Sequence, residues 1–199
     1  MKVPRALRGA LAVIAVAGAA GCATVVPPPV APVAIETAAA FDASGRLSAR
    51  RGSEGVAANF TWAHAPDSDR FDVATPLGQV IARLSGDPSG VNLQRPGQVP
   101  VAYADWSALT RDVFGVAIPV DGLASWIQAQ PVAGTAFDLE RDAHGRPLVL
   151  RQQGWEIVYA YANPQPAANP MRLVMRYPDS EPIEVRIVVD RWQLAATIR

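Results

Sequence analysis

Apolar and polar residues alternate along most of the chain from residue 45 onward, which is the period-2 pattern of strands with one buried face. Stretches rich in glycine, proline and aspartate separate these runs. About ten runs occur, at residues 45–50, 56–62, 69–74, 80–84, 91–93, 137–141, 147–152, 155–161, 171–177 and 183–189. Because most neighbouring runs are joined by short turns, the pattern predicts a meander of antiparallel strands with one apolar and one solvated face.

Two short segments interrupt the alternation with apolar residues at helical spacing. The first runs over residues 105–113, with Asp105 suited to the N-cap and Gly115 closing the segment. The second begins near Asp121, which can cap it. The apolar positions of the two segments are Trp106, Leu109, Val113, Leu123, Trp126 and Ile127. Each segment therefore carries a tryptophan that must cover another apolar surface, and a third short helix is expected to start within residues 35–41.

The turn between residues 69–74 and 80–84 has an unusual residue at its tip. The sequence Thr75-Pro76-Leu77-Gly78 fits a type I turn, because proline is favoured at its second position and glycine at its fourth. Leu77 then occupies the corner that projects furthest. Two interpretations stay open: Leu77 folds back onto the sheet, or it is an apolar probe that meets a membrane or an acyl chain.

The N-terminus has the features of an export signal. Residues 1–8 carry three positive charges, residues 9–21 are small and apolar, and Cys22 follows as the only cysteine of the chain. The stretch Ala19-Ala20-Gly21-Cys22 resembles the lipobox of bacterial lipoproteins, in which the leader is cut before a cysteine that carries diacylglycerol. An uncleaved membrane helix is the alternative, but its alanine and glycine would make it weakly hydrophobic. Ala23 after the cysteine suggests, by the same resemblance, the outer membrane.

Domain organisation follows from these features. We expect a signal peptide at residues 1–21, a lipidated N-terminus with a proline-rich tether at residues 22–40, and one folded domain at residues 41–199. The prolines between residues 23 and 34 favour extended polyproline II structure. With 18 basic and 18 acidic residues, the chain has no electrostatic footprint for nucleic acid, so no nucleic-acid partner is expected.

The apolar face of the predicted sheet has bulky side chains. A twisted antiparallel sheet of about ten strands curls toward a barrel, which holds either packed side chains or one hydrophobic ligand. The inward positions of the strands are Phe60, Trp62, Phe71, Leu84, Trp155, Ile157, Tyr159, Leu173, Met175, Ile183, Val185 and Ile187, below the six helical residues named above. The pattern alone favours a filled core, whereas export, lipidation and an exposed leucine favour a cavity that holds lipid.

Catalytic chemistry has little support in the sequence. His64 and His144 both lie beside turn residues, and neither belongs to a metal-binding pattern. No Gly-x-Ser-x-Gly elbow, phosphate loop or dinucleotide fingerprint occurs. The acid pairs Asp67/Asp69 and Glu140/Asp142 lie in or beside turns, where solvated carboxylates are ordinary. We therefore expect no enzyme, no metal site and no cofactor.

Several short motifs occur together behind the lipobox. They are Gly45-Arg46-Leu47, Phe60-x-Trp62, Pro76-Leu77-Gly78-Gln79, Gly115-Val-Ala-Ile118-Pro119, Leu123-x-x-Trp126-Ile127 and Trp155-x-Ile-Val-Tyr159. On these motifs the chain resembles the LolB family, the outer-membrane receptors of the bacterial lipoprotein-localisation pathway, from about Phe41 to Leu194. One departure is Ala129-Gln130-Pro131, where the family commonly has glycine before the proline, and it affects only the exit of the second helix.

The resemblance implies a mainly β fold, an incomplete antiparallel β-barrel of about 10–11 strands with short α-helices forming a lid over an apolar cavity. It implies a monomer, anchored through Cys22 at the periplasmic face of the outer membrane. Such a receptor accepts lipoproteins from a soluble periplasmic carrier of similar fold and inserts them into the outer-membrane lipid. The family's leucine for that last step maps onto Leu77, and the inward residues above would line the acyl-chain cavity. The alternative is a scaffold lipoprotein of the envelope with a filled β core.

Overall fold

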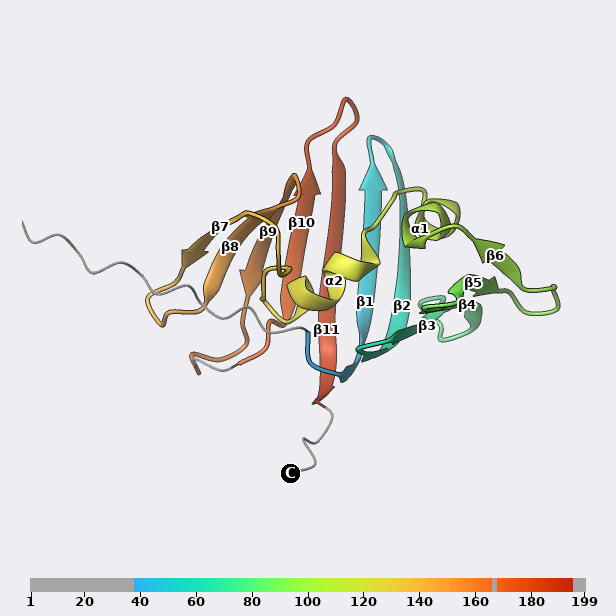
Figure 1. The fold of residues 1–199 in the computed structure, drawn as a ribbon, viewed down its shortest axis with the longest axis horizontal. Helices are drawn as coiled ribbons and strands as arrows, with labels where there is room; N and C mark the ends of the chain where they lie inside the picture. Colours follow the sequence, from blue (N-terminus) through green and yellow to red (C-terminus); the bar gives the residue numbers. More distant parts are fainter. Residues whose placement is uncertain (1–37, 166–167, 195–199) are drawn as a thin grey trace, which may run out of the picture. The chain divides into compact units, whose positions relative to one another are not determined.

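Eleven antiparallel strands form one continuous sheet in the computed structural model, which describes residues 38–165 and 168–194 (Figure 1). The strands are β1 (Phe41–Arg51), β2 (Glu54–Ala65), β3 (Ser68–Ala74), β4 (Val80–Asp87), β5 (Gly90–Gln94), β6 (Val101–Tyr103), β7 (Phe137–Arg141), β8 (Pro147–Gln152), β9 (Trp155–Ala160), β10 (Arg172–Tyr177) and β11 (Ile183–Leu194). Their spatial order is β6-β5-β4-β3-β2-β1-β11-β10-β9-β8-β7. The edges β6 and β7 do not pair with each other, so the predicted open antiparallel architecture is confirmed.

The ten predicted strands all occur, and the sheet adds β6, which the alternation did not indicate. The helix expected within residues 35–41 is wrong for its described part, because residues 38–40 have no regular structure and β1 begins at Phe41. The pairing of β1 with β11 shifts register between Ser44 and Gly45, which is a β-bulge. A side chain at Gly45 would overlap the carbonyl oxygen of Val188, so glycine is required at this close approach.

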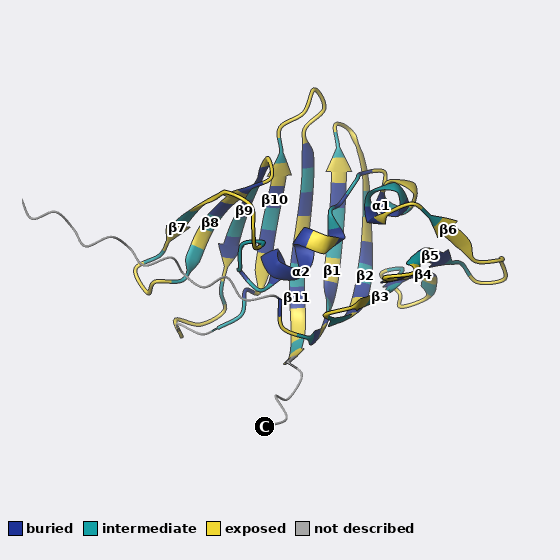
Figure 2. Cartoon of the chain, in the orientation of Figure 1, coloured by how far each residue is buried: buried dark blue, intermediate teal, exposed yellow. Residues whose placement is uncertain are grey.

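The alternating pattern becomes one buried and one exposed face, seen as alternating bands along β10, β11 and β2 in Figure 2. On β11, for example, Val185, Ile187 and Val189 are buried, whereas Arg186 and Asp190 are exposed. Residues 38–194 build a contiguous hydrophobic core among themselves, with contributions from both helices and from strands in both halves of the sheet. We therefore expect a chain that lacks residues 1–22 to fold.

The first helix, α1 (Trp106–Phe114), has the predicted caps. The Asp105 Oδ1 atom accepts a hydrogen bond from the Ala108 backbone N–H at 2.7 Å. Gly115 takes the left-handed conformation, with φ at 74°, and its N–H donates to the Arg111 carbonyl oxygen. Both features match the residue types that cap helices, because glycine enters this conformation without a Cβ clash.

The second helix, α2 (Val120–Ile127), differs from the prediction at its start. Its N-cap is Pro119, which has no side-chain hydrogen bond, and Asp121 lies in the first turn. The cap predicted for Asp121 is therefore wrong. Figure 1 shows α2 lying across the inner face of the sheet, over β11 and β1. Neither helix of the described residues is long and apolar enough to cross a bilayer.

Candidate functional site

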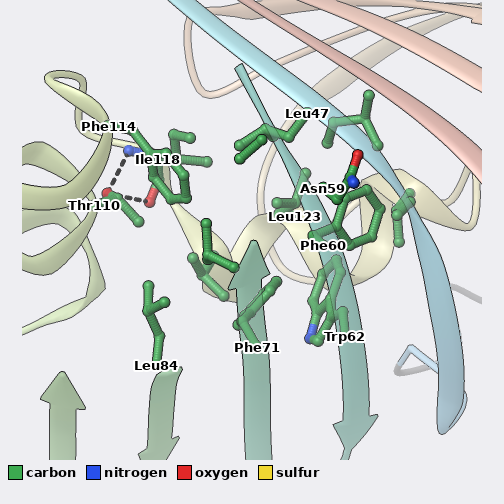
Figure 3. A pocket seen from close by; sticks show the side chains of 15 residues that line it. Leu47, Asn59, Phe60, Trp62, Phe71, Leu84, Thr110, Phe114, Ile118 and Leu123 are labelled. Carbon is green, nitrogen blue, oxygen red and sulfur yellow. Dashed lines mark hydrogen bonds between the residues drawn. The ribbon is translucent and has the colours of Figure 1, made fainter. Parts of the chain in front are cut away.

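An apolar cavity lies between the inner face of the sheet and the lid, by which we mean α1, α2 and the linker of residues 115–119 (Figure 3). Its volume is about 40 Å³. The sheet contributes residues of β1, β2, β3, β4 and β11 to its walls. The lining residues are Leu47, Ala58, Asn59, Phe60, Trp62, Phe71, Val73, Leu84, Thr110, Phe114, Ile118, Val120, Leu123, Ile127 and Ile187. Almost all of these side chains are apolar, so the space suits hydrocarbon and offers little to a polar ligand.

The structure divides the eighteen residues predicted for an acyl-chain cavity into two groups. Seven line this cavity, namely Phe60, Trp62, Phe71, Leu84, Leu123, Ile127 and Ile187. Eleven do not, namely Trp106, Leu109, Val113, Trp126, Trp155, Ile157, Tyr159, Leu173, Met175, Ile183 and Val185. Ten of those eleven are buried and Val113 is half-buried. The hollow part of the interior thus lies on the β1–β4 side, whereas the β8–β10 side is packed.

Aromatic side chains fill the packed side. The Trp126 and Trp155 ring centroids are 6.5 Å apart, and Trp155 lies 5.3 Å from the Tyr177 ring. Burial raises the pKa of Tyr159, whose hydroxyl has no hydrogen-bond partner among the described residues. A buried hydroxyl without a hydrogen-bond partner lowers the free energy of unfolding. Its presence here shows that the interior around Tyr159 is apolar.

Polar contacts fix the tryptophan wall of the cavity. The Trp62 Nε1–H donates to Asp69 Oδ1 at 2.6 Å, and His64 Nδ1 lies 2.8 Å from the same oxygen. The Trp62 ring stacks on Phe71 with centroids 4.5 Å apart and meets Phe41 edge to face at 4.9 Å. Asp69 was expected to be an ordinary carboxylate beside a turn. Its position opposite His64 in the β2–β3 hairpin is the signal that could have identified it. This wall of the cavity is therefore held from several sides.

Few polar contacts attach the lid to the sheet. Gln152 on β8 is buried, and its Oε1 atom accepts from Trp126 Nε1 at 2.9 Å and from the Val132 N–H at 2.8 Å. Its Nε2 atom donates to the Val132 carbonyl oxygen at 2.9 Å and to Thr135 Oγ1 at 2.7 Å. This single side chain therefore fastens the C-terminal end of α2 and the segment after it to the packed half of the sheet. Over the cavity itself, α2 contributes the apolar Val120, Leu123 and Ile127.

The loop between β3 and β4 displays Leu77 on a well-defined turn. The Gly78 N–H donates to the Thr75 carbonyl oxygen at 2.8 Å, and the Thr75 N–H donates to the Gln79 carbonyl oxygen at 2.9 Å. Gly78 has a φ of 88°, which a residue with a side chain adopts only under strain. Leu77 is 98% exposed. The interpretation in which Leu77 folds back onto the sheet is therefore wrong.

Comparison with known proteins identifies the family of this chain. The family model described as "Outer membrane lipoprotein LolB" matches residues 39–192. The chain belongs to the LolB family. An outer-membrane lipoprotein LolB of Thiobacillus denitrificans is 39% identical over 175 residues, which cover 88% of this chain and 91% of the relative. One of Azoarcus sp. is 34% identical over 195 residues, covering 98% and 99% of the two chains.

Family membership confirms the predicted outer-membrane localisation of a lipid-anchored protein. Cys22 and the predicted signal peptide lie outside the described residues. Among solved structures, a LolA superfamily protein of Nitrosomonas europaea has a similar fold, with a TM-score of 0.50 and 10% identity. That likeness covers 79% of this chain and 87% of the other, and it concerns the fold alone.

In this LolB-family chain, one side chain connects the cavity to the protruding loop. Asn59 on β2 lines the cavity, and its Nδ2 atom donates to the carbonyl oxygens of Thr75 at 3.1 Å and Pro76 at 3.4 Å. These bonds hold the first half of the turn that carries Leu77. Asn59 was not among the predicted site residues, because the alternation with its buried neighbours Ala58 and Phe60 places it on the solvated face of the strand.

Proposed function

We propose that this protein is the outer-membrane receptor that accepts lipoproteins from a soluble periplasmic carrier and inserts them into the outer membrane. The observation that carries the proposal is the apolar cavity beside a rigid turn that exposes Leu77. The cavity supplies a place for acyl chains after they leave the carrier, and the turn supplies the contact with the bilayer. The LolB-family membership and the LolA-like fold support the same assignment.

The size of the cavity determines how binding must proceed. A cavity of about 150 Å³ lined by Leu, Ile and Phe holds benzene, so the observed volume of about 40 Å³ is too small for an acyl chain. Entry therefore requires the lid to move away from the sheet. The driving force is apolar burial, since each methylene group removed from water contributes about 0.8 kcal/mol. The lid lines the cavity with apolar side chains, among them Phe114, Leu123 and Ile127, and it can exchange those contacts for contacts with hydrocarbon.

Transfer under this proposal involves no bond making. Acyl chains move from the carrier to the receptor when the receptor holds them more tightly, and a difference of about 1.4 kcal/mol gives a tenfold bias. Leu77 then enters the bilayer, and burial of a leucine side chain contributes roughly 1.5–3 kcal/mol. The order of affinities from carrier to receptor to membrane sets the direction of transport.

Binding of a fluorescent fatty-acyl probe to the chain lacking residues 1–22 tests the proposal. We expect the probe to bind and to be displaced by lipoprotein. The variant Ala58→Leu should weaken binding because Ala58 lines the cavity, whereas Ala57→Leu on the opposite face of the same strand should not. Thermal unfolding of each variant controls for folding. Absence of probe binding to the folded parent would contradict the proposal.

The second candidate is a scaffold lipoprotein of the envelope with a filled core. The packed β8–β10 side and the small cavity volume favour it. A scaffold would not bind the acyl probe and would not respond to Ala58→Leu, so the same measurement separates the two functions.

A further inference from the structure

The outer face of the sheet carries a ladder of paired charges across β7 to β11. Neighbouring strands place opposite charges side by side, in the order Asp138, Arg151, Glu156, Arg176 and Glu184. Arg151 lies 3.1 Å from Asp138 and 3.2 Å from Glu156. Arg176 lies 4.0 Å from Glu156 and 3.1 Å from Glu184. In this region, therefore, each arginine of the ladder is matched by acidic neighbours.

A groove beside the ladder has a different charge balance. It occupies about 440 Å³ over β10, β11, β1 and β2, and its charged residues belong to the outer face. Its lining residues are Arg46, Leu47, Ser48, Ala57, Ala58, Asn59, Pro76, Arg172, Val174, Arg186 and Val188. Three of its lining residues, Leu47, Ala58 and Asn59, also line the cavity. Three arginines and no acidic residue line this basic groove, and two valines lie between the arginines. Such a surface combines positive charge with apolar area.

The three arginines differ in how firmly they are paired. The side chain of Arg172 has no ion-pair or hydrogen-bond partner among the described residues. Arg46 contacts both carboxylate oxygens of Asp190, at 2.9 and 3.3 Å, and the two side chains are 64% and 50% exposed. Arg186 lies 2.7 Å from Glu184, which it shares with Arg176. A ligand can therefore bind Arg172 without breaking an ion pair, and the exposed pair of Arg46 remains accessible to it.

The basic groove adjoins the turn that carries Leu77. Pro76 lines the groove, and Asn59, which holds that turn, is the cross-strand neighbour of Arg46. Arg46 and Arg172 in turn flank Val188 in the same row of the sheet. A molecule that inserts Leu77 into a bilayer therefore brings these arginines to the level of the lipid headgroups.

We propose that the basic groove binds the phosphate groups of anionic phospholipids and lays the outer face of β1, β10 and β11 against the membrane surface. The role of Leu77 in this arrangement depends on the proposed function, whereas headgroup binding does not. Guanidinium groups suit phosphate oxygens, which they bind in bidentate fashion. A basic residue near an anionic membrane contributes about 1 kcal/mol, so each arginine should change binding about fivefold.

Vesicle binding of the chain lacking residues 1–22 tests this proposal. We expect stronger sedimentation with phosphatidylcholine vesicles that contain phosphatidylglycerol than with pure phosphatidylcholine, and a decrease with added salt. Arg172→Gln should lower binding to the anionic vesicles about fivefold and leave binding to neutral vesicles unchanged. The matched control is Arg151→Gln, an outer-face arginine of the paired ladder, which should bind like the parent. Arg46→Gln combined with Arg172→Gln should lower binding further.

Other outcomes separate the possible occupants of the groove. Equal binding of Arg172→Gln and the parent to anionic vesicles overturns the proposal. The proposal is also overturned if Arg172→Gln no longer transfers lipoprotein from the carrier to neutral vesicles. That result would mean that the groove binds an acidic surface of the carrier. Displacement by millimolar inorganic phosphate would indicate a site for the free ion instead. Acyl-probe binding by the same variants reports separately on the proposed function, and the variants should not change it.

Discussion

The substitution Leu77→Glu isolates the proposed membrane contact from every other property of the protein. Leu77 is 98% exposed, and the turn around it is held by backbone groups and Asn59, so the free energy of unfolding should change by less than about 0.5 kcal/mol. The parent gains roughly 1.5–3 kcal/mol when the leucine enters hydrocarbon. A glutamate at this position does not gain this free energy, because its charged side chain stays out of hydrocarbon. We therefore predict that delivery into membranes falls roughly 10- to 150-fold.

Delivery can be measured with purified components, by following a labelled lipoprotein from its carrier into liposomes through the receptor. Leu77→Ala should give part of the loss without adding charge. Gln79→Glu adds the same charge two positions along the loop and keeps the leucine, so it should deliver at nearly the parental rate. Acyl-probe binding should be equal in all these variants. Parental delivery by Leu77→Glu would refute the insertion step, and loss of probe binding in that variant would refute the separation of loop from cavity.

Three further substitutions test the interior and the charges. Gln152→Leu leaves Trp126 Nε1 without its buried acceptor, so urea unfolding should show a loss of about 2–3 kcal/mol. Tyr159→Phe removes a buried hydroxyl that has no partner among the described residues, and should raise the free energy of unfolding by about 1 kcal/mol or leave it unchanged. Arg146 holds the pKa of Asp142 below its usual value, so this carboxylate stabilises the fold above its unfolded pKa near 4. Asp142→Asn should therefore be less stable than the parent at neutral pH, and the difference should shrink as the pH falls below about 4.

Strand positions were predictable because a sheet with one buried face imposes the same period on sequence and structure. The alternation of Ile183 to Val189, for example, becomes a buried and an exposed row of β11. The edge strand β6 was missed because it has only three residues, which follow a proline. None of the three is fully buried, so the strand needs no alternation of apolar and polar residues. The cap of α2 was misplaced because the helix begins at Val120, directly after Pro119, which puts Asp121 inside the first turn.

The cavity lining was only partly predictable, because alternation identifies the buried face but not where that face stays unfilled. The position of the cavity depends on where large side chains meet. Trp126, Trp155 and Tyr177 fill the space under one end of the lid. At the other end, the lining includes Ile118 from the linker between the helices, a segment that has no periodic pattern.

The small volume of the cavity agrees with the free-energy cost of an unfilled core. An unfilled core volume costs about 24 cal/mol per Å³, so the observed 40 Å³ costs about 1 kcal/mol. A void about ten times larger would cost roughly 10 kcal/mol, which is comparable to the whole stability of a typical domain. A receptor that kept room for an acyl chain while empty would therefore be close to unfolding. Closing the lid onto the sheet avoids that cost, so the proposed function predicts that hydrocarbon binding and lid opening occur as one coupled event.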